Sequence, residues 1–385
     1  MRILWIYSVP DEWTRQWNER NLQQHRGAGF DVRGFCTTLP YLDGQWLPYY
    51  ELNRRWRVGE TSLMRMYHDL LNALADRDAF VLYNGANLHP EFVRWLDLFK
   101  VYTCADDPES TEILSKPLCR GYDVYLVNNI ACVSMYRDWG MTNVHFWPLG
   151  SLATEEENGR LTEEEVGDIQ NRDLKIFIAC ERMSPWRRDR LDKLIAAFPQ
   201  AKCVGAGWPQ SIVSWSDLWQ LYKRAQIGWN LHNSTGPVNF RTYDLAAMGV
   251  MQICDNKEGL RKIYHHGREV VGFDTIEECI DLTRYYLDHV EEQRAIALGG
   301  WQRWRQDYTP ERVWDRLIKM VTPAWEVQKQ RRQPLDINCL QEQLHRHASR
   351  VFAKRLIHRS IRWSAHYLQR YRMRRLVKNL FLRDT

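Results

Sequence analysis

Short apolar runs alternate with longer amphipathic stretches along the first 150 residues. Ile3–Tyr7 is an apolar run that predicts a strand, Arg15–Arg26 has the spacing of a helix, and Asp31–Cys36 predicts a second strand. The same rhythm predicts strands at Ala79–Tyr83, Val101–Ala105, Asp123–Asn128 and Val144–Trp147, with helices at Pro90–Phe99 and Val133–Trp139. Strands that alternate with helices predict a parallel sheet covered on both faces.

Residues 151–173 interrupt this rhythm with a polar stretch that contains two runs of three glutamates. We place a linker here. The alternation then restarts with strands at Leu174–Ala179, Lys202–Val204, Ile227–Leu231 and Val250–Cys254, and helices at Arg187–Phe198, Leu218–Arg224, Tyr243–Met248, Ile276–Asp288, Val290–Arg305 and Pro310–Lys319. A chain of 385 residues exceeds the usual size of one core. The pattern therefore predicts two α/β, Rossmann-like domains, 1–150 and 174–325, facing each other across a cleft.

The charge distribution separates a third region, a tail over 326–385. Residues 345–385 hold twelve Lys and Arg and one acid, which gives this segment a net charge of +11. Because the whole chain carries +5, residues 1–344 carry −6. Apolar residues recur among these cations at helical spacing, which predicts a basic amphipathic helical tail. Three uses stay open for it: packing on the acidic body, docking to an anionic membrane surface, or binding nucleic acid.

Several function classes lose their usual support. The nine cysteines form no C-x-x-C pair, which predicts reduced thiols and no metal site. No phosphate-binding P-loop, H-E-x-x-H helix or G-x-S-x-G turn occurs. The first apolar run is too short for a secretory leader, and no run approaches a membrane span. We expect a cytoplasmic protein, with a peripheral position at the inner face of the membrane as the alternative.

The segment Leu221–Gly249 concentrates hydrogen-bonding side chains beyond the end of a predicted strand. Asn230, His232, Asn233, Ser234 and Asn239 lie between that strand and a short helix that carries Asp244. Ligands of parallel α/β sheets bind beyond the carboxyl ends of the strands. The segment therefore predicts a site for a hydroxyl-rich ligand.

This segment resembles the donor-binding region of spore-maturation-type glycosyltransferases. The similarity lies in Leu231-His232-Asn233, Asn239-Phe240-Arg241-Thr242-Tyr243-Asp244 and Ala247-Met248-Gly249, and weaker likeness covers residues 1–320. The resemblance implies a GT-B fold, in which the second domain holds a nucleotide-sugar such as a UDP-sugar and the first holds the acceptor. It also implies that Asp244 binds the ribose hydroxyls and that Arg241 faces the diphosphate or structural neighbours, with Tyr243 in the same motif.

One position departs from the retaining enzymes of this fold. They often carry an E-x7-E pair that ends where Asp244 stands, and eight positions earlier this chain has Gly236. The residues therefore do not decide between retention and inversion, and of the two we prefer retention.

Cations and carboxylates elsewhere complete the expected site. Arg182 and Arg187 follow the first strand of the second domain, where guanidinium groups and a helix N-terminus stabilise a leaving diphosphate without a metal; the alternative is that both are solvated surface residues. Asp106 and Asp107 follow a predicted strand of the first domain and are the preferred acceptor bases, with His89 and His25 behind them. Asp106-Asp107-Pro108 as an ordinary turn is the alternative.

These patterns predict a metal-independent glycosyltransferase that needs no cofactor beyond its nucleotide-sugar. The acceptor, whether a glycan, lipid, protein or modified DNA, is left open. Two other functions are compatible with the sequence: a non-catalytic binding protein with a basic tail on a decayed transferase fold, and a nucleotide-sugar epimerase.

Overall fold

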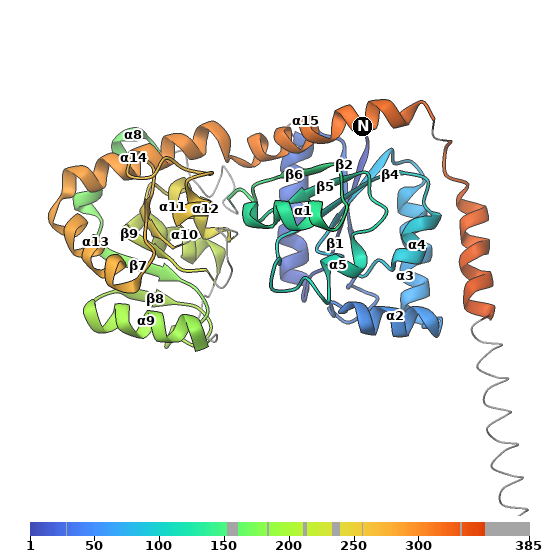
Figure 1. The fold of residues 1–385 in the computed structure, drawn as a ribbon, viewed down its shortest axis with the longest axis horizontal. Coiled ribbons are helices and arrows are strands. Elements are labelled where there is room, and N and C mark those ends of the chain that lie inside the picture. Colours follow the sequence, from blue (N-terminus) through green and yellow to red (C-terminus); the bar gives the residue numbers. More distant parts are fainter. Residues whose placement is uncertain are drawn as a thin grey trace, which may run out of the picture.

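The computed structural model describes residues 1–27, 29–151, 161–182, 185–210, 214–232, 239–255, 257–331 and 333–350. They form two lobes, each built on a parallel sheet (Figure 1). The first sheet has the order β2-β1-β3-β4-β5-β6, made of Ile3–Tyr7 (β1), Val32–Cys36 (β2), Ala79–Tyr83 (β3), Phe99–Cys104 (β4), Val124–Val127 (β5) and Val144–Phe146 (β6). The second has the order β11-β10-β9-β7-β8, made of Leu174–Ala179 (β7), Lys202–Val204 (β8), Ala225–Asn230 (β9), Met251–Cys254 (β10) and Val271–Gly272 (β11).

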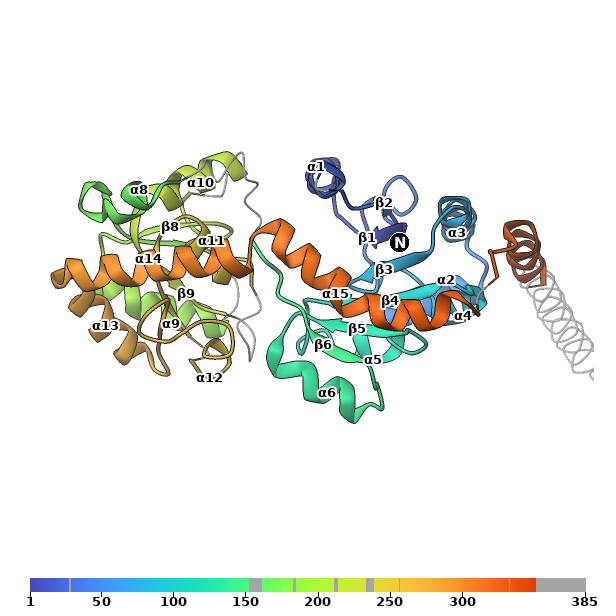
Figure 2. The ribbon, with the colours of Figure 1, turned by 90° about the horizontal axis from the view of Figure 1, so that it is seen from above.

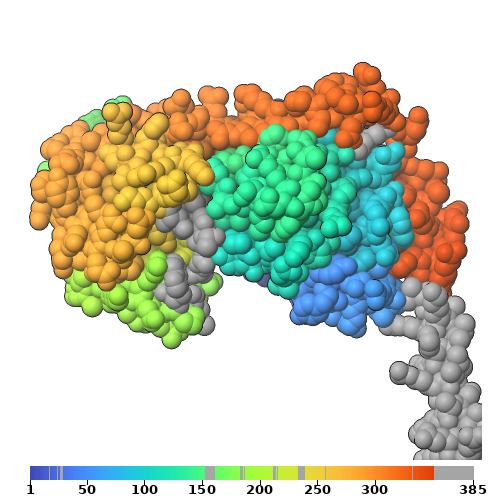
Figure 3. Space-filling model, in the orientation of Figure 1, coloured from blue at the N-terminus to red at the C-terminus, as the bar shows by residue number. Residues whose placement is uncertain are grey.

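Helices cover both faces of each sheet, as the apolar strands require. Those of the first lobe are Glu12–Gly27 (α1), Tyr49–Arg57 (α2), Thr61–Leu74 (α3), Pro90–Trp95 (α4), Ser115–Leu118 (α5) and Val133–Asp138 (α6). Those that follow are Glu163–Gly167 (α8), Pro185–Ala197 (α9), Trp215–Arg224 (α10), Arg241–Ala247 (α11), Lys257–Leu260 (α12), Ile276–Asp288 (α13), Val290–Asp307 (α14) and Pro310–Lys329 (α15). The α/β class and the pair of Rossmann-like sheets predicted from the sequence are confirmed. Figure 3 shows the surface hollowed between the lobes.

Most strands lie where the apolar runs predict them, but two helical regions differ. The amphipathic helices α2 and α3 fill a stretch for which the sequence predicted no element, and α3 buries seven of its residues against the first sheet. The helix predicted over Pro90–Phe99 ends at Trp95, because Leu96 is extended and Phe99 already pairs with Ala79 in the sheet. A short apolar run did not distinguish the end of the helix from the start of the strand.

Helix α15 packs on the first lobe, although it follows the second lobe in the chain. The sequence grouped Pro310–Lys319 with the second domain. In the structure Val313, Trp314, Leu317 and Val321 are buried against β1, β3 and β4, and the indole N–H of Trp147 donates to the Val313 carbonyl at 2.8 Å. Helices α14 and α15 thus run in succession over the second and first lobes (Figure 2).

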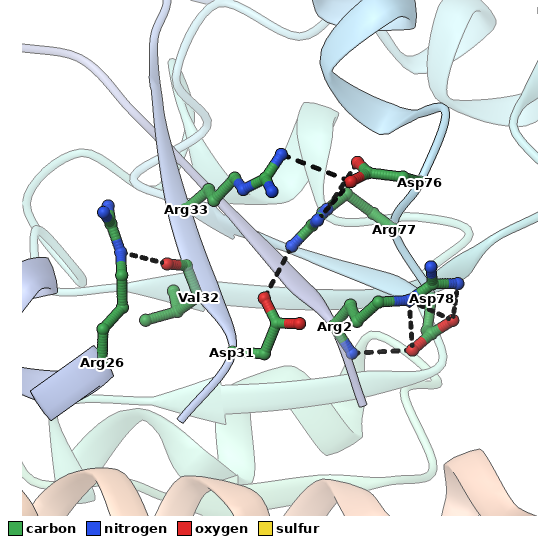
Figure 4. Close-up of polar contacts among 8 residues, drawn as sticks. All are labelled: Arg2, Arg26, Asp31, Val32, Arg33, Asp76, Arg77 and Asp78. Atoms are coloured by element: carbon green, nitrogen blue, oxygen red, sulfur yellow. Dashed lines mark hydrogen bonds and ion pairs between the residues drawn. The ribbon is translucent and has the colours of Figure 1, made fainter. Parts of the chain in front are cut away.

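The amino ends of β1, β2 and β3 are tied together by ion pairs (Figure 4). The guanidinium of Arg77 is 2% exposed and contacts both Asp31 and Asp76, while Arg2 binds Asp78 through its backbone and its side chain. Figure 4 shows these contacts crossing between the segments that lead into the three strands. Because charged partners close this edge of the sheet, the opposite carboxyl edge is the one that offers loops to a ligand.

The described part of the tail packs on the first lobe. Residues 337–350 are helical, Leu340 and Leu344 join its core, and the ring of His347 stacks on Trp56 at 4.0 Å. Of the basic segment 345–385, residues 345–350 belong to this packed helix. Residues 351–385, on which all three hypotheses for the tail depend, lie outside the described residues. Within the part of the chain that is described, no helix has the length and apolar character needed to cross a membrane.

His89 makes the first lobe sensitive to acid. Its ring is buried against Trp56, its Nδ1 accepts the N–H of Glu91 at the start of α4, and burial lowers its pKa to about 4. An unfolded histidine titrates near 6.5, so the stability from the neutral ring is complete above pH 6.5 and is lost as pH falls towards 4. We expect this residue to remove about 3 kcal/mol of unfolding free energy over that range.

Urea unfolding between pH 7 and pH 4 measures this effect. His89→Asn keeps an acceptor for the helix start but does not titrate, so its stability should fall less steeply with acid than that of the wild type. Parallel pH profiles for the two proteins would contradict the assignment.

Candidate functional site

Asn230 organises the carboxyl edge of the second sheet from the end of β9. Its side chain is fully buried, and its amide donates to Thr242 Oγ1 at 3.1 Å and to Gln252 Oε1 at 2.8 Å. Its oxygen accepts from Asn239 Nδ2 at 2.8 Å and from Arg241 Nε at 3.2 Å. Two donors and two lone pairs are the whole capacity of an amide. Asn230 therefore shapes the site and has no hydrogen bond left for a ligand.

Asn239 and Arg241 connect this amide to the start of α11. The Asn239 oxygen accepts the backbone N–H of Thr242 at 3.0 Å, so it serves as a cap near the start of the helix. Arg241 also donates to the carbonyls of Ala179 at 2.5 Å and Leu231 at 2.9 Å, which joins the ends of β7 and β9. The guanidinium is partly buried and is held by structural neighbours. Of the two roles that the resemblance implied for Arg241, diphosphate binding or structural support, these contacts correspond to structural support.

His232 lies inside the same network. It is 1% exposed, its Nδ1 lies 2.5 Å from Asp255 Oδ1, and its Nε2 lies 3.2 Å from Thr242 Oγ1. Asp255, which follows β10, also accepts the backbone N–H of His232 at 2.9 Å. Both ring nitrogens thus have partners, so His232 supports the loop from within.

A buried trio of metal-binding type overlaps this network. Ligand atoms of His232, Cys254 and Asp255 lie within 4.8 Å of one another, a grouping that the cysteine spacing did not predict. Burial raises the pKa of the Cys254 thiol, and the charge of Asp255 raises it further, so the neutral thiol is favoured at pH 7. Within the structure, His232 and Asp255 already bond each other, so the trio contributes to the internal network at this edge.

Arg187 brings a second positive charge to this edge. It lies in the first turn of α9, is 7% exposed, and donates to the Glu181 carbonyl at 3.2 Å. Burial lowers the pKa of its guanidinium, and the nearby charge of Arg241 lowers it further. The first turn of α9 contains no acidic residue. Arg187 thus places a cation in the N-terminal turn of α9, and both the cation and the helix N-terminus favour an anion.

Arg182 is held differently. Its guanidinium pairs with Asp192 and lies over the ring of Trp208, 5.1 Å from the centroid. The loop after β8 passes close to the residue that follows β7, and only glycine fits there. Gly205 has φ +128°, and an added Cβ would lie 2.5 Å from the Cys180 carbonyl oxygen. Gly205-Ala-Gly207 is thus a tight turn. Arg187 lies inside the first turn of α9, whereas Arg182 precedes the helix, so the position of Arg187 suits a phosphate better than that of Arg182.

Asp244 lies where the two lobes meet. It is 2% exposed and accepts a hydrogen bond from Ser151 Oγ at 2.6 Å, so the end of the first lobe touches α11. Tyr243 beside it is fully buried and packs on Tyr308 with ring centroids 5.1 Å apart. Tyr243 is therefore part of the core, whereas Asp244 borders both lobes. Asn233 and Gly236 lie outside the described residues.

The two acidic candidates of the first lobe have different environments. Asp107 is fully buried, and its carboxylate accepts the hydroxyls of Ser115, Tyr136 and Thr111 at 2.6, 2.6 and 3.1 Å. Because this carboxylate is buried and bonded by three hydroxyls, a structural role suits Asp107 better than that of the acceptor base. His89 is likewise buried in its stack.

Asp106 remains exposed at the carboxyl edge of the first sheet. Asn84, which has φ +49°, donates to Asp106 Oδ2 at 2.9 Å and accepts the N–H of Ala105 at 2.8 Å. Desolvation by the surrounding protein raises the pKa of Asp106, and Asp107 and Glu109 raise it further. A carboxylate with a raised pKa is a stronger base.

Sequence reasoning missed three features of this region. Asp255 directly follows a predicted strand, a position that could have drawn attention to it. Ser151 lies in the predicted linker, and nothing local links it to Asp244. The aromatic residues that converge above β1 come from distant segments and share no motif.

Comparisons with known proteins identify the fold and one segment of the chain. Residues 185–319 match the sequence profile of the glycosyl transferase-like family. A comparison with curated protein sequences finds no match. Sucrose-phosphate synthase from Thermosynechococcus elongatus is similar in structure with a TM-score of 0.62 at 13% identity, over 85% of this chain and 100% of its own.

Two further solved structures have similar folds. HepE from Anabaena in complex with UDP-glucose gives a TM-score of 0.58 at 12% identity, over 84% of this chain and 100% of its own. A protein from Listeria monocytogenes that carries the name of a UDP-N-acetylglucosamine 2-epimerase gives 0.52 at 8% identity, over 84% and 96% of the two chains. The chain therefore has the GT-B fold, with a glycosyl transferase-like segment in its second lobe.

Proposed function

We propose that the protein transfers a glycosyl group from a nucleotide-sugar, such as a UDP-sugar, to an acceptor hydroxyl without a metal ion. The observation that carries the proposal is the position of Arg187, which is 7% exposed in the first turn of α9 and bonds the backbone that follows β7. This arrangement suits a diphosphate, and Asp244 at the start of α11 suits the ribose hydroxyls of the same donor. The UDP-glucose complex of HepE, which has the same fold, supports this choice of donor.

In the proposed reaction the acceptor oxygen bonds to the anomeric carbon as the bond from that carbon to the diphosphate oxygen breaks. The diphosphate leaves with the bonding electrons, and Arg187 stabilises its charge together with the helix N-terminus. Asp106 takes the proton of the acceptor hydroxyl. We extend the proposal to retention of anomeric configuration, which requires the acceptor oxygen to bond on the same face of the sugar that the diphosphate leaves. We also extend it to the spore-maturation-type branch, because Asn239–Asp244 resembles the motif of those enzymes.

Turnover of a panel of UDP-, GDP- and ADP-sugars in the presence of EDTA tests this function. We expect release of nucleoside diphosphate from at least one donor, unchanged by the chelator. The absence of both binding and hydrolysis across the panel would refute the proposal. Formation of an isomerised nucleotide-sugar without diphosphate release would favour the epimerase, which the fold of the Listeria protein keeps under consideration.

Replacement of Arg187 tests the diphosphate site. Arg187→Ala should weaken UDP binding about 10- to 100-fold, the effect of losing a charge-assisted hydrogen bond. Arg188→Ala is the matched control, because Arg188 is the next residue of α9 and is exposed. Calorimetric titration with UDP measures both variants. Equal affinities in the two would remove Arg187 from the site.

Replacement of Asp106 tests the acceptor base. Asp106→Asn should lower kcat about 100-fold or more with little change in the KM of the donor, because the amide cannot take the proton. The wild-type rate should fall on the acid side as Asp106 becomes protonated, at a pH above the ordinary carboxyl value because its pKa is raised. Asp107→Asn should instead lower thermal stability. An acid limb that persists in Asp106→Asn would assign the base elsewhere.

A further inference from the structure

A cavity of about 300 Å³ lies in the first lobe beside the proposed site. Its wall is built from the end of β1, one face of α1, the segment after β6 and the start of α15. Protein interiors hold few voids larger than a water molecule, whereas small-molecule pockets begin near this volume. The cavity is therefore large enough to accept a ligand.

Aromatic rings from distant parts of the chain surround the cavity. Trp5 is the lining ring that the others approach, with ring centroids 5.7 Å from Tyr83, 6.0 Å from Trp147 and 5.6 Å from Trp314. His25 stacks on Trp314 at 4.6 Å. Such walls favour flat or apolar groups, which gain from leaving water and from contact with ring faces.

The cavity carries no formal charge. Among the described residues that line it, none is Lys, Arg, Asp or Glu. Its polar side chains are those of Ser8, Thr14, Asn18, Asn21 and Ser151, together with the ring nitrogens and hydroxyls of the lining His, Trp and Tyr residues. Burial lowers the pKa of His25 to about 4, so its ring is neutral at physiological pH. A phosphate or another anion would lose its hydration here without a compensating cation. The chemistry of the walls suits an uncharged occupant.

The position of the cavity links it to the proposed transfer reaction. Ser151 lines it and donates to Asp244, and Phe240, which also lines it, directly precedes α11. Tyr83 lines it as well, and the next residue, Asn84, donates to Asp106 Oδ2 at 2.9 Å. A molecule seated in the cavity would thus contact residues that adjoin both the proposed base and the proposed donor site.

We infer that this cavity binds an uncharged, apolar or aromatic part of the acceptor, so the acceptor hydroxyl is carried by a hydrophobic small molecule or lipid-like group. This inference rests on the proposed function for the meaning of "acceptor", but the cavity and its preference for neutral apolar ligands are testable alone. It disfavours nucleic acid and other polyanions as the group held here.

The face of α1 offers a way to fill the cavity without changing its aromatic walls. Thr14, Asn18 and Asn21 lie on the cavity side of the helix at spacings of three or four residues, and Gln23 is exposed and does not line it. Asn18→Phe should occupy the space with a bulky ring. Asn21→Phe is a second filling variant, and Gln23→Phe adds the same ring to the same helix outside the cavity.

Binding of the neutral dye N-phenyl-1-naphthylamine, followed by its fluorescence, tests the inference. We expect the wild type and Gln23→Phe to bind it equally, folded Asn18→Phe or Asn21→Phe to bind at least tenfold more weakly, and UDP not to displace it. Equal dye affinity in wild type and filling variants, or displacement by UDP, would overturn the inference.

Titration of UDP into the same proteins separates this inference from the proposed function. UDP affinity should be unchanged in Asn18→Phe and reduced in Arg187→Ala. Dye affinity should be reduced in Asn18→Phe and unchanged in Arg187→Ala. Dye binding without any UDP binding would support the cavity and count against the transferase. If UDP binds and the filling variants bind the dye as tightly as the wild type, the proposed transferase function is retained and the apolar acceptor site is refuted.

Discussion

At the carboxyl end of β9, the buried amide of Asn230 uses both of its N–H donors and both lone pairs of its oxygen. Each of these bonds fixes an element of the second lobe: Thr242 and Asn239 at α11, Gln252 on β10, and Arg241 across the end of β7. Burial lowers the pKa of Arg187, and the charge of Arg241 lowers it further. Loss of any one partner would leave a buried polar group of Asn230 without a hydrogen bond, which costs free energy. The members of the network therefore depend on one another. The proposed donor site depends on it.

The path of the chain provides the second constraint. Parallel strands place all their carboxyl ends on one edge, and ion pairs around Arg77 close the other edge of the first sheet. Helix α15 then returns to the first lobe and contributes Trp314 to the aromatic cavity. Ser151 and Asp244 join the lobes beside it. The cationic donor site that we propose and the uncharged aromatic cavity are thus neighbours. This arrangement suits a reaction between an anionic donor and an apolar acceptor.

The strands were readable from the sequence because buried parallel strands are nearly continuous apolar runs. The site was readable in part. Asn230 and Asp244 lie at the carboxyl edge of the second sheet, where the sequence predicted a site. Asn230 and His232 are nevertheless internal, because a polar residue after a strand looks the same whether it binds a ligand or a neighbouring segment. Asp106 and Asp107 are adjacent in sequence and differ completely in exposure, a difference that depends on Ser115 and Tyr136. The cavity depends on α15 crossing to the first lobe, which no local pattern encodes.

Hydrogen–deuterium exchange with and without saturating UDP tests most directly that the donor diphosphate lies between β7, α9 and α11. The account predicts slower exchange of backbone amides in residues 179–182, 185–190 and 239–244, with residues 14–25 of α1 unaffected. Protection confined to α1 and the first lobe, or no protection in the second lobe at saturation, would contradict it.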